Sequence, residues 1–135
     1  MTASAISSAP VRRAAVCELS QRFFFEAAHT LERSIDAEGS RRIHGHTYHA
    51  EITLLGTPDP ASGMLVDLAY VRAEIARVRD QLDHRFLDEV PDLGPATLEN
   101  LCAYLRDQLE PVLPQLCAVM VERQASGDRC SLRWV

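Results

Sequence analysis

Three histidines in the first half of the chain have the residue type and spacing of a metal site. His44 and His46 flank Gly45, and His29 ends an apolar run upstream. Side chains alternate faces along an extended backbone, so His44 and His46 point the same way if this segment is a strand. A catalytic zinc typically takes three protein ligands and leaves a fourth position open. If a neighbouring strand brings His29 alongside, the three predict a zinc site; otherwise they are ordinary polar residues at a sheet edge.

The composition is that of one folded domain. The chain has 135 residues and a hydrophobic fraction of 47%, which is sufficient for a core. Its formal net charge of −5 argues against nucleic acid as a partner, and no apolar run reaches the roughly 18 residues of a membrane span. The four cysteines form no Cys-x-x-Cys pair, which favours reduced thiols in a cytoplasmic protein. We expect residues 1–16 to be a flexible tail before a domain over 17–135.

Hydrophobic periodicity predicts the elements that must position the histidines. The segment from Ser34 to Arg42 is polar and is expected to be a loop. The stripe from Leu68 to Leu82 has three- and four-residue spacing, which predicts an amphipathic helix. In chain order, we expect strands over 17–31 and 44–55, helices after the N-caps Asp67 and Thr97, and strands over 116–121 and 130–135, joined by a turn over 125–128.

The order strand–strand–helix–helix–strand–strand predicts an α+β fold. Two hairpins would form an antiparallel sheet, with both helices on one face. Such a sheet keeps open edges unless other copies pair with them. We therefore expect the protein to form a homo-oligomer.

Several motifs occur together and in one order along the chain. They are Phe25-Glu26-Ala27-Ala28-His29, His44-Gly45-His46, Leu82-Asp83-His84, Thr97-x-Glu99-Asn100 and the final hairpin. In this combination the chain resembles the 6-pyruvoyl- and 6-carboxy-tetrahydropterin synthases over roughly residues 17–135. The resemblance is strongest to the bacterial 6-carboxy-tetrahydropterin synthases of 7-deazapurine biosynthesis.

The resemblance implies a tunnelling fold, in which three protomers close a barrel and two trimers stack into a hexamer with active sites between protomers. It implies zinc (Zn²⁺) bound by the three histidines, a small-molecule substrate, 7,8-dihydroneopterin triphosphate, and no nucleic-acid or membrane partner. It assigns proton transfer to Asp83 and His84 and substrate binding to Thr97. The alternative for Asp83 and His84 is a helix C-terminal cap, since the helix dipole favours a cation there.

The loop before His44 departs from the family pattern. In the closest branch the catalytic cysteine lies four residues before this histidine, where the chain has Ser40. Another branch has it six residues before, where the chain has Glu38. A cysteine thiol has a pKa of about 8.5 and is readily activated. A serine hydroxyl is far harder to ionise and needs a dedicated base. A carboxylate can itself be a general base, so Ser40 and Glu38 are the catalytic candidates of this loop.

The third predicted strand departs from the pattern as well. Family members have there a glutamate that binds the N–H groups of the pterin, and the matching position is Arg123. Arginine has no acceptor, but it binds carboxylates and phosphates. Glu122 would face the other way unless a bulge shifts the strand. Both residues are substrate-binding candidates, together with Arg41 or Arg42 beside the histidine motif.

Three hypotheses follow. The first is a zinc-dependent lyase on dihydroneopterin triphosphate or a close relative, with Glu38 or a water on the zinc in place of the thiolate. The second is a diverged paralogue that keeps the zinc but takes an anionic non-pterin substrate through Arg123 and Arg41 or Arg42. The third is a noncatalytic zinc-containing binding protein. The retained pair Asp83-His84 favours an enzyme, because a binding protein needs no proton relay.

Overall fold

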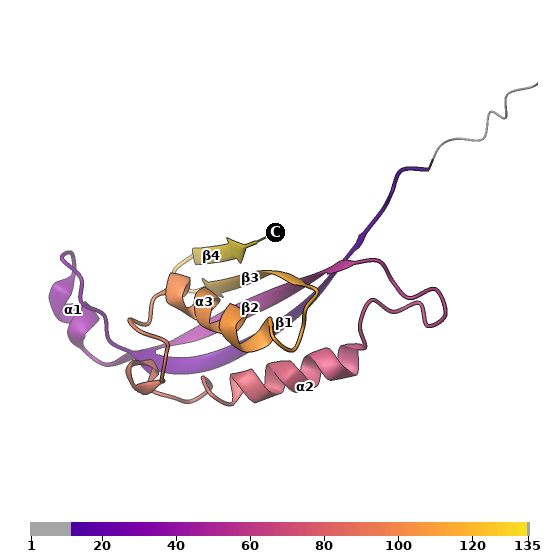
Figure 1. The fold of residues 1–135 in the computed structure, drawn as a ribbon. Coiled ribbons are helices and arrows are strands. Elements are labelled where there is room, and N and C mark those ends of the chain that lie inside the picture. Colours follow the sequence, from indigo (N-terminus) through magenta and orange to yellow (C-terminus); the bar gives the residue numbers. More distant parts are fainter. Residues whose placement is uncertain (1–11, 135) are drawn as a thin grey trace, which may run out of the picture.

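The computed structural model describes residues 12–134 and contains one four-stranded antiparallel sheet (Figure 1). The order of the strands in the sheet is their order in the chain. The expected succession of two strands, two main helices and two strands is confirmed. The strands are β1 Cys17–His29, β2 His44–Gly56, β3 Leu116–Arg123 and β4 Asp128–Arg133.

The two main helices are α2 (Leu68–Arg79) and α3 (Leu98–Leu109). Both begin at the predicted caps, since the side chain of Asp67 accepts a hydrogen bond from the Ala69 amide and that of Thr97 from the Asn100 amide. Their apolar sides and the alternate residues of the strands share a single core, so both helices cover one face of the sheet. The residues buried between them include Phe25, Tyr48, Ile52, Leu54, Val71, Ile75, Val78, Leu101, Leu105, Val119 and Val121.

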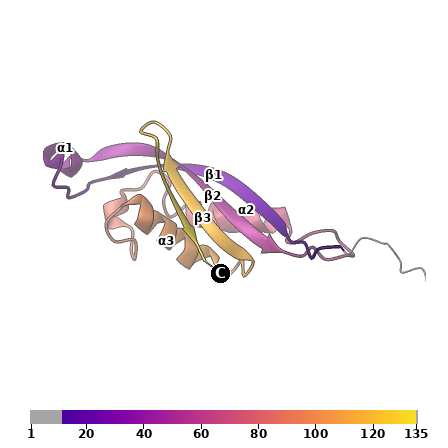
Figure 2. The same cartoon turned by 90° about the horizontal axis from the view of Figure 1, so that it is seen from above.

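The predicted loop over 34–42 is wrong in part, because it contains the short helix α1 (Ala37–Arg41). Apolar periodicity cannot predict one turn of helix. Ser40 holds it in place through its backbone, since its amide donates to the carbonyl of Asp36 and its carbonyl accepts from the amide of Leu31. Figures 1 and 2 show α1 at one end of the sheet, away from α2 and α3. A second unpredicted turn is the 3₁₀ helix η1 (Leu87–Glu89).

Some predicted boundaries also change. The first strand ends at His29 rather than at residue 31, and α2 ends at Arg79, although Leu82 is still buried in the turn that follows. The last strand starts earlier than expected, at Asp128. The tail expected over residues 1–16 falls mostly on residues 1–11, which lie outside the described residues, as does residue 135.

The strand register decides which side chains share the helix-covered face. β1 and β2 pair without interruption, with Ala27 opposite His46 and His29 opposite His44. The pairing of β2 with β3 is regular from Ala118 to Glu122, and its one irregularity lies between Thr53 and Leu54. The strands therefore reach the histidines with an alternation that no bulge has shifted.

Removing the hydroxyl of Thr97 should destabilise the protein without disordering the site. The change Thr97→Ala takes away the N-cap of α3 and is expected to cost about 1 kcal/mol of unfolding free energy, measured by urea denaturation. Thr97→Ser keeps an acceptor at the cap and should stay close to the wild type. Equal stability of Thr97→Ala and the wild type would contradict a capping role.

None of the helices among residues 12–134 is long and apolar enough to cross a membrane.

Candidate metal centre

The three histidines meet at the end of the sheet where β1 finishes and β2 begins. Nε2 of His29 lies 2.9 Å from Nε2 of His44 and 3.0 Å from Nε2 of His46. The His29 side chain is fully buried, whereas His44 and His46 are partly exposed. One nitrogen from each of three imidazoles is a donor set that could hold a metal ion, with one side open to a ligand.

Backbone carbonyls fix the ring orientation of two of these histidines. Nδ1 of His29 donates to the carbonyl oxygen of Ala96 at 2.9 Å, and Nδ1 of His44 donates to that of Arg42 at 2.8 Å. With the proton on Nδ1, each Nε2 carries a lone pair that points to the common centre. Outer hydrogen bonds of this kind select the tautomer that binds a metal. The residues present therefore fit a divalent cation such as zinc, for which imidazole is a suitable ligand.

Burial favours the neutral form of two of the rings, His29 and His46. Burial, followed by the neighbouring His29 and Arg123, lowers the pKa of His46 to about 4. Burial also lowers the pKa of His29, and the hydrogen bond to Ala96 opposes that shift. Neutral imidazole is the form that coordinates metals, so the two rings need not lose a proton before they bind one.

A hollow of about 280 Å³ opens beside the triad. His44 and His46 form one of its walls, while Ser40 and Arg123 come from α1 and β3. The hairpin turn and the segment before α1 complete the lining. The full set is Leu31, Arg33, Asp36, Gly39, Ser40, His44, His46, Arg123, Ser126 and Asp128.

Arg123 faces this hollow and Glu122 does not. Glu122 pairs with His49, on the sheet face opposite to His46 and Tyr48. Its carboxylate accepts from Nε2 of Gln124 at 3.2 Å. The register between β2 and β3 has no bulge near this point, so the shift that would bring Glu122 toward the histidines is not present.

The candidates on and around α1 differ in their positions. Ser40 is buried, with 5% of its surface exposed, and lines the hollow. Glu38 is exposed and forms an ion pair with Arg42 at 2.7 Å. Arg41 is exposed as well, and neither Glu38 nor Arg41 belongs to the lining of the hollow. Of these candidates from the sequence, only Ser40 lies beside the triad.

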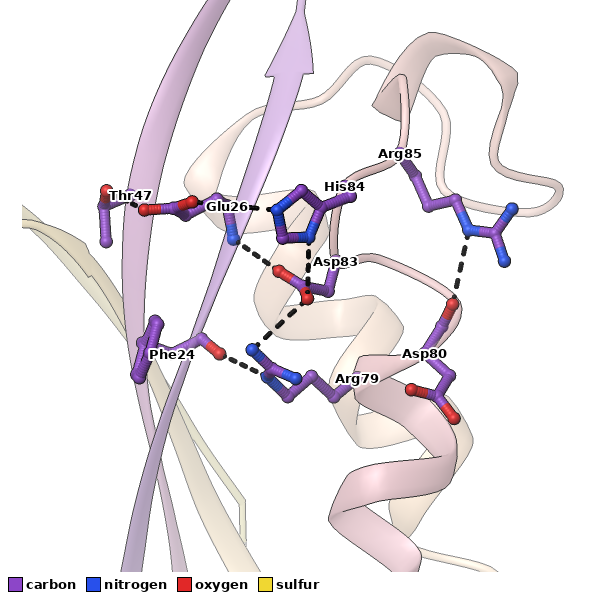
Figure 3. A network of polar contacts seen from close by, with 8 residues as sticks. All are labelled: Phe24, Glu26, Thr47, Arg79, Asp80, Asp83, His84 and Arg85. Carbon is purple, nitrogen blue, oxygen red and sulfur yellow. Dashed lines mark hydrogen bonds and ion pairs between the residues drawn. The ribbon is translucent and has the colours of Figure 1, made fainter.

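Asp83 and His84 form a second polar cluster where the turn after α2 runs along β1 (Figure 3). Nδ1 of His84 lies 2.9 Å from Oδ2 of Asp83, and Nε2 of His84 lies 3.9 Å from Oε2 of Glu26. The other carboxylate oxygen of Asp83 accepts from the Glu26 amide at 2.9 Å, and Arg79 approaches Oδ2 at 3.2 Å. This carboxylate orients the imidazole, and contacts from β1 and α2 hold the carboxylate.

The backbone of His84 is in the left-handed region, with φ of 57°. Its amide donates to the Glu26 carbonyl at 2.6 Å, so the turn adds to the open edge of β1. The side chain is 75% exposed and borders a hollow of about 530 Å³. A helix cap would not require an aspartate bound to the neighbouring strand, so the geometry suits an exposed acid–base group.

The two clusters lie on opposite faces of the sheet. Glu26 and Thr47, which are paired across β1 and β2, point to the face of His84, as Figure 3 shows. Ala27 and His46 are the next pair and point to the helix-covered face. Within one chain, His84 therefore stands beside the strands that carry the triad, but on the other side of them.

Acid should weaken the anchoring of this cluster. The hydrogen bond from the Glu26 amide, together with His84 and Arg79, lowers the pKa of Asp83 below its ordinary value of 3.8. The unfolded chain then binds the proton first, so stability falls as the pH drops from about 5 through 3.8. In Asp83→Asn this dependence should be shallower. Urea midpoints at pH 6, 4.5 and 3.5, as approximate settings, measure it; parallel curves for the two proteins would contradict the shift.

Three residues around the two clusters were not predicted as site residues from the sequence. Ala96 contributes only its carbonyl, Glu26 accepts from Thr47 and faces His84, and Asp128 accepts from both Ser126 and Arg123. Glu26 lies inside a motif and could have been singled out as a carboxylate beside a histidine-ended strand. A backbone carbonyl cannot be recognised from residue type.

Comparison with known proteins agrees with this architecture. Residues 18–133 match the family model described as 6-pyruvoyl tetrahydropterin synthase. The Homo sapiens 6-pyruvoyl tetrahydrobiopterin synthase is 32% identical over 111 residues, which cover 72% of this chain and 77% of that protein. The 6-carboxy-5,6,7,8-tetrahydropterin synthase of Synechocystis is 32% identical over 108 residues, with 75% and 81% covered.

Solved structures share the fold. The Caenorhabditis elegans 6-pyruvoyl tetrahydropterin synthase has a TM-score of 0.78 at 28% identity and covers 93% of this chain and 100% of its own. A Plasmodium vivax 6-pyruvoyltetrahydropterin synthase, solved as a variant with cysteine in place of a catalytic glutamate, has a TM-score of 0.66 at 18% identity and covers 90% and 100%. At that identity the second likeness concerns the fold alone.

Proposed function

The chain belongs to the 6-pyruvoyl tetrahydropterin synthase family, and we propose that it is a zinc-dependent carbon–oxygen lyase acting on 7,8-dihydroneopterin triphosphate or a related compound. The observation that carries the proposal is the convergence of three Nε2 atoms, two of them with the tautomer fixed by a carbonyl. When bound, zinc would supply a Lewis acid for the side-chain oxygens of the substrate. The human and Synechocystis enzymes are equally similar to the chain, at 32% identity. The four-residue spacing from Ser40 to His44 resembles the 6-carboxy branch, so we propose that branch and, with it, a cytoplasmic role in 7-deazapurine biosynthesis.

We assign proton transfer to His84, oriented by Asp83. The hydrogen bond of 2.9 Å to Nδ1 leaves Nε2 of His84 free to exchange a proton with the substrate. The carboxylate stabilises the imidazolium formed in that exchange. Glu26 lies 3.9 Å from the same Nε2 and comes from the neighbouring strand β1.

The pair and the triad lie on opposite faces of their own sheet, which supports active sites between protomers. In this arrangement His84 of one copy transfers protons at the active site that contains the triad of a neighbouring copy. The open edges of β1 and β4 would be paired in the same assembly. We therefore propose a closed homo-oligomer, a hexamer of two trimers.

The base that replaces the family's cysteine is assigned to α1. Ser40 lines the hollow but its hydroxyl is difficult to ionise, whereas Glu38 is a carboxylate that is paired with Arg42 in the isolated chain. We propose Glu38 as the base, released from Arg42 when a substrate or a second protomer approaches.

The experiment is to purify the protein with its native metal, quantify zinc per chain, and follow 7,8-dihydroneopterin triphosphate by mass spectrometry. We expect stoichiometric zinc and conversion that survives Ser40→Ala but falls in Glu38→Gln. Equal conversion by Glu38→Gln and the wild type would remove Glu38 from the mechanism. Protein without zinc would overturn the proposed function as a whole.

A second candidate is a diverged paralogue with an anionic non-pterin substrate. The position of Arg123 in the hollow favours it, because a guanidinium has no acceptor for the N–H groups of a pterin. Stoichiometric zinc with no conversion of the pterin substrate would support this candidate. A noncatalytic binding protein would show zinc and ligand binding with no turnover of any substrate.

A further inference from the structure

We propose that the hollow beside the histidines is an oxyanion subsite, in which Arg123 binds a carboxylate or phosphate of the ligand. The inference rests on the proposed function for the metal at the triad. The contacts of Arg123 are made by the chain alone and do not depend on that metal. In this inference, Arg123 determines which chemical group of a ligand binds in the hollow. The group must present acceptors, since a guanidinium only donates.

One end of the Arg123 side chain is tied to the hairpin turn. One terminal nitrogen (Nη2) of Arg123 lies 2.9 Å from Oδ2 of Asp128, and the same oxygen accepts from the Ser126 hydroxyl at 2.7 Å. The side chain is 19% exposed. A guanidinium fixed at one end loses little conformational freedom when a ligand binds its other nitrogens.

Part of its hydrogen-bonding capacity is unused. Nε of Arg123 is buried and has no hydrogen-bond partner among residues 12–134. The hydroxyl of Tyr48, on the same sheet face and next to His46 in the alternation of β2, is also buried without a partner there. A buried donor left unpaired carries a desolvation cost, which an acceptor on a ligand that reaches Nε would offset.

The protein charges around the hollow cancel, so a cation bound at the triad would favour an anionic ligand. Apart from the histidines, its ionisable lining residues are Arg33, Arg123, Asp36 and Asp128, whose formal charges cancel. A divalent cation on the neutral triad then leaves two positive charges for the ligand to offset. Asp128 is already engaged with Arg123, and its pKa is lowered by the Ser126 hydroxyl and by Arg123, so it stays ionised.

Two ligand types carry such an oxyanion. One is the phosphate chain of the proposed substrate, and the other is a small hydroxycarboxylate with no pterin ring. In both, one oxygen would face the metal while the oxyanion meets Arg123. Neither places the amino edge of a pterin against this residue, and Glu122, the carboxylate that could bind that edge, faces away.

The test is calorimetric titration of metal-free and zinc-loaded protein with pyrophosphate, with glycolate and with 7,8-dihydroneopterin, which has no phosphate. We expect Arg123→Gln to weaken binding of an oxyanion probe by about 10- to 150-fold, the value for a hydrogen bond to a charged group. Pyrophosphate as the better probe would identify the phosphate chain, and glycolate the hydroxycarboxylate. The Arg123→Glu protein should bind neither pyrophosphate nor glycolate. It should bind 7,8-dihydroneopterin more tightly than the wild type does.

Arg129→Gln is the matched control. Arg129 lies in the same hairpin, opposite Glu122, and is exposed, so its loss should leave both oxyanion affinities unchanged. If Arg123→Gln does not fold, as judged by thermal melting, Arg123→Lys keeps the charge without the planar fork and should bind with intermediate affinity.

Equal oxyanion affinities of the Arg123 variants and the wild type would overturn the inference, as would the absence of oxyanion binding. Failure of the proposed function gives a different pattern. In that case zinc or turnover is missing while the dependence of oxyanion binding on Arg123 persists in the metal-free protein.

Discussion

Replacing His29 by alanine is expected to abolish stoichiometric metal binding. This side chain is fully buried and its Nε2 lies within 3.0 Å of both other Nε2 atoms. Removing an outer partner of a metal ligand costs 10- to 100-fold in affinity, so losing the ligand itself should cost more than about 100-fold. Zinc per chain, measured by mass spectrometry of the metal after dialysis, reports the effect.

His49→Ala is the control for this experiment. His49 lies on the same strand as two of the ligands, but it pairs with Glu122 on the opposite face. Its loss should leave the zinc content at the wild-type value. Since alanine at position 29 also empties a buried site, His44→Ala, at a partly exposed ligand, gives a second measurement with less effect on folding. Wild-type zinc content in both ligand variants would contradict the triad as the metal site.

Replacing His84 by asparagine is expected to reduce kcat for the family reaction by about 10²- to 10⁴-fold, the usual contribution of a general acid or base. Asparagine is preferable to alanine, because the backbone at this position has a φ of 57° and asparagine tolerates the left-handed region better than alanine. The zinc content should not change, since His84 stands on the face away from the triad. Turnover is followed by mass spectrometry of the products.

Arg85→Gln serves as the comparison for His84→Asn. Arg85 is the next residue of the same turn, and its side chain donates to the Asp80 carbonyl rather than to the Asp83–His84 pair. The Arg85→Gln protein should retain most of the activity.

Mixed oligomers test the arrangement between copies. Inactive His84→Asn and inactive His44→Ala chains should recover activity when combined, because some sites then receive an intact His44 from one chain and an intact His84 from the other. Full activity of His84→Asn alone would exclude the proton-transfer role.

The short-range patterns of the sequence determined the fold class, the order of the elements and the candidate metal ligands. The His-x-His spacing, the apolar run that ends at His29, and the caps Asp67 and Thr97 are local features, since each depends on the period of a strand or on the first turn of a helix. These patterns were sufficient for the α+β class and the order of the elements. They also identified the three histidines that the sheet brings together.

Only the tertiary structure decided the surroundings of these histidines. The carbonyl of Ala96 reaches His29 across 67 positions of the chain, and the register of β3 against β2 turns Arg123 toward the hollow and Glu122 away. Helix α1 was missed because a single turn leaves no periodic signal. Contacts of this kind depend on how distant segments pack and on main-chain atoms that every residue carries, and residue types along the sequence do not encode them individually.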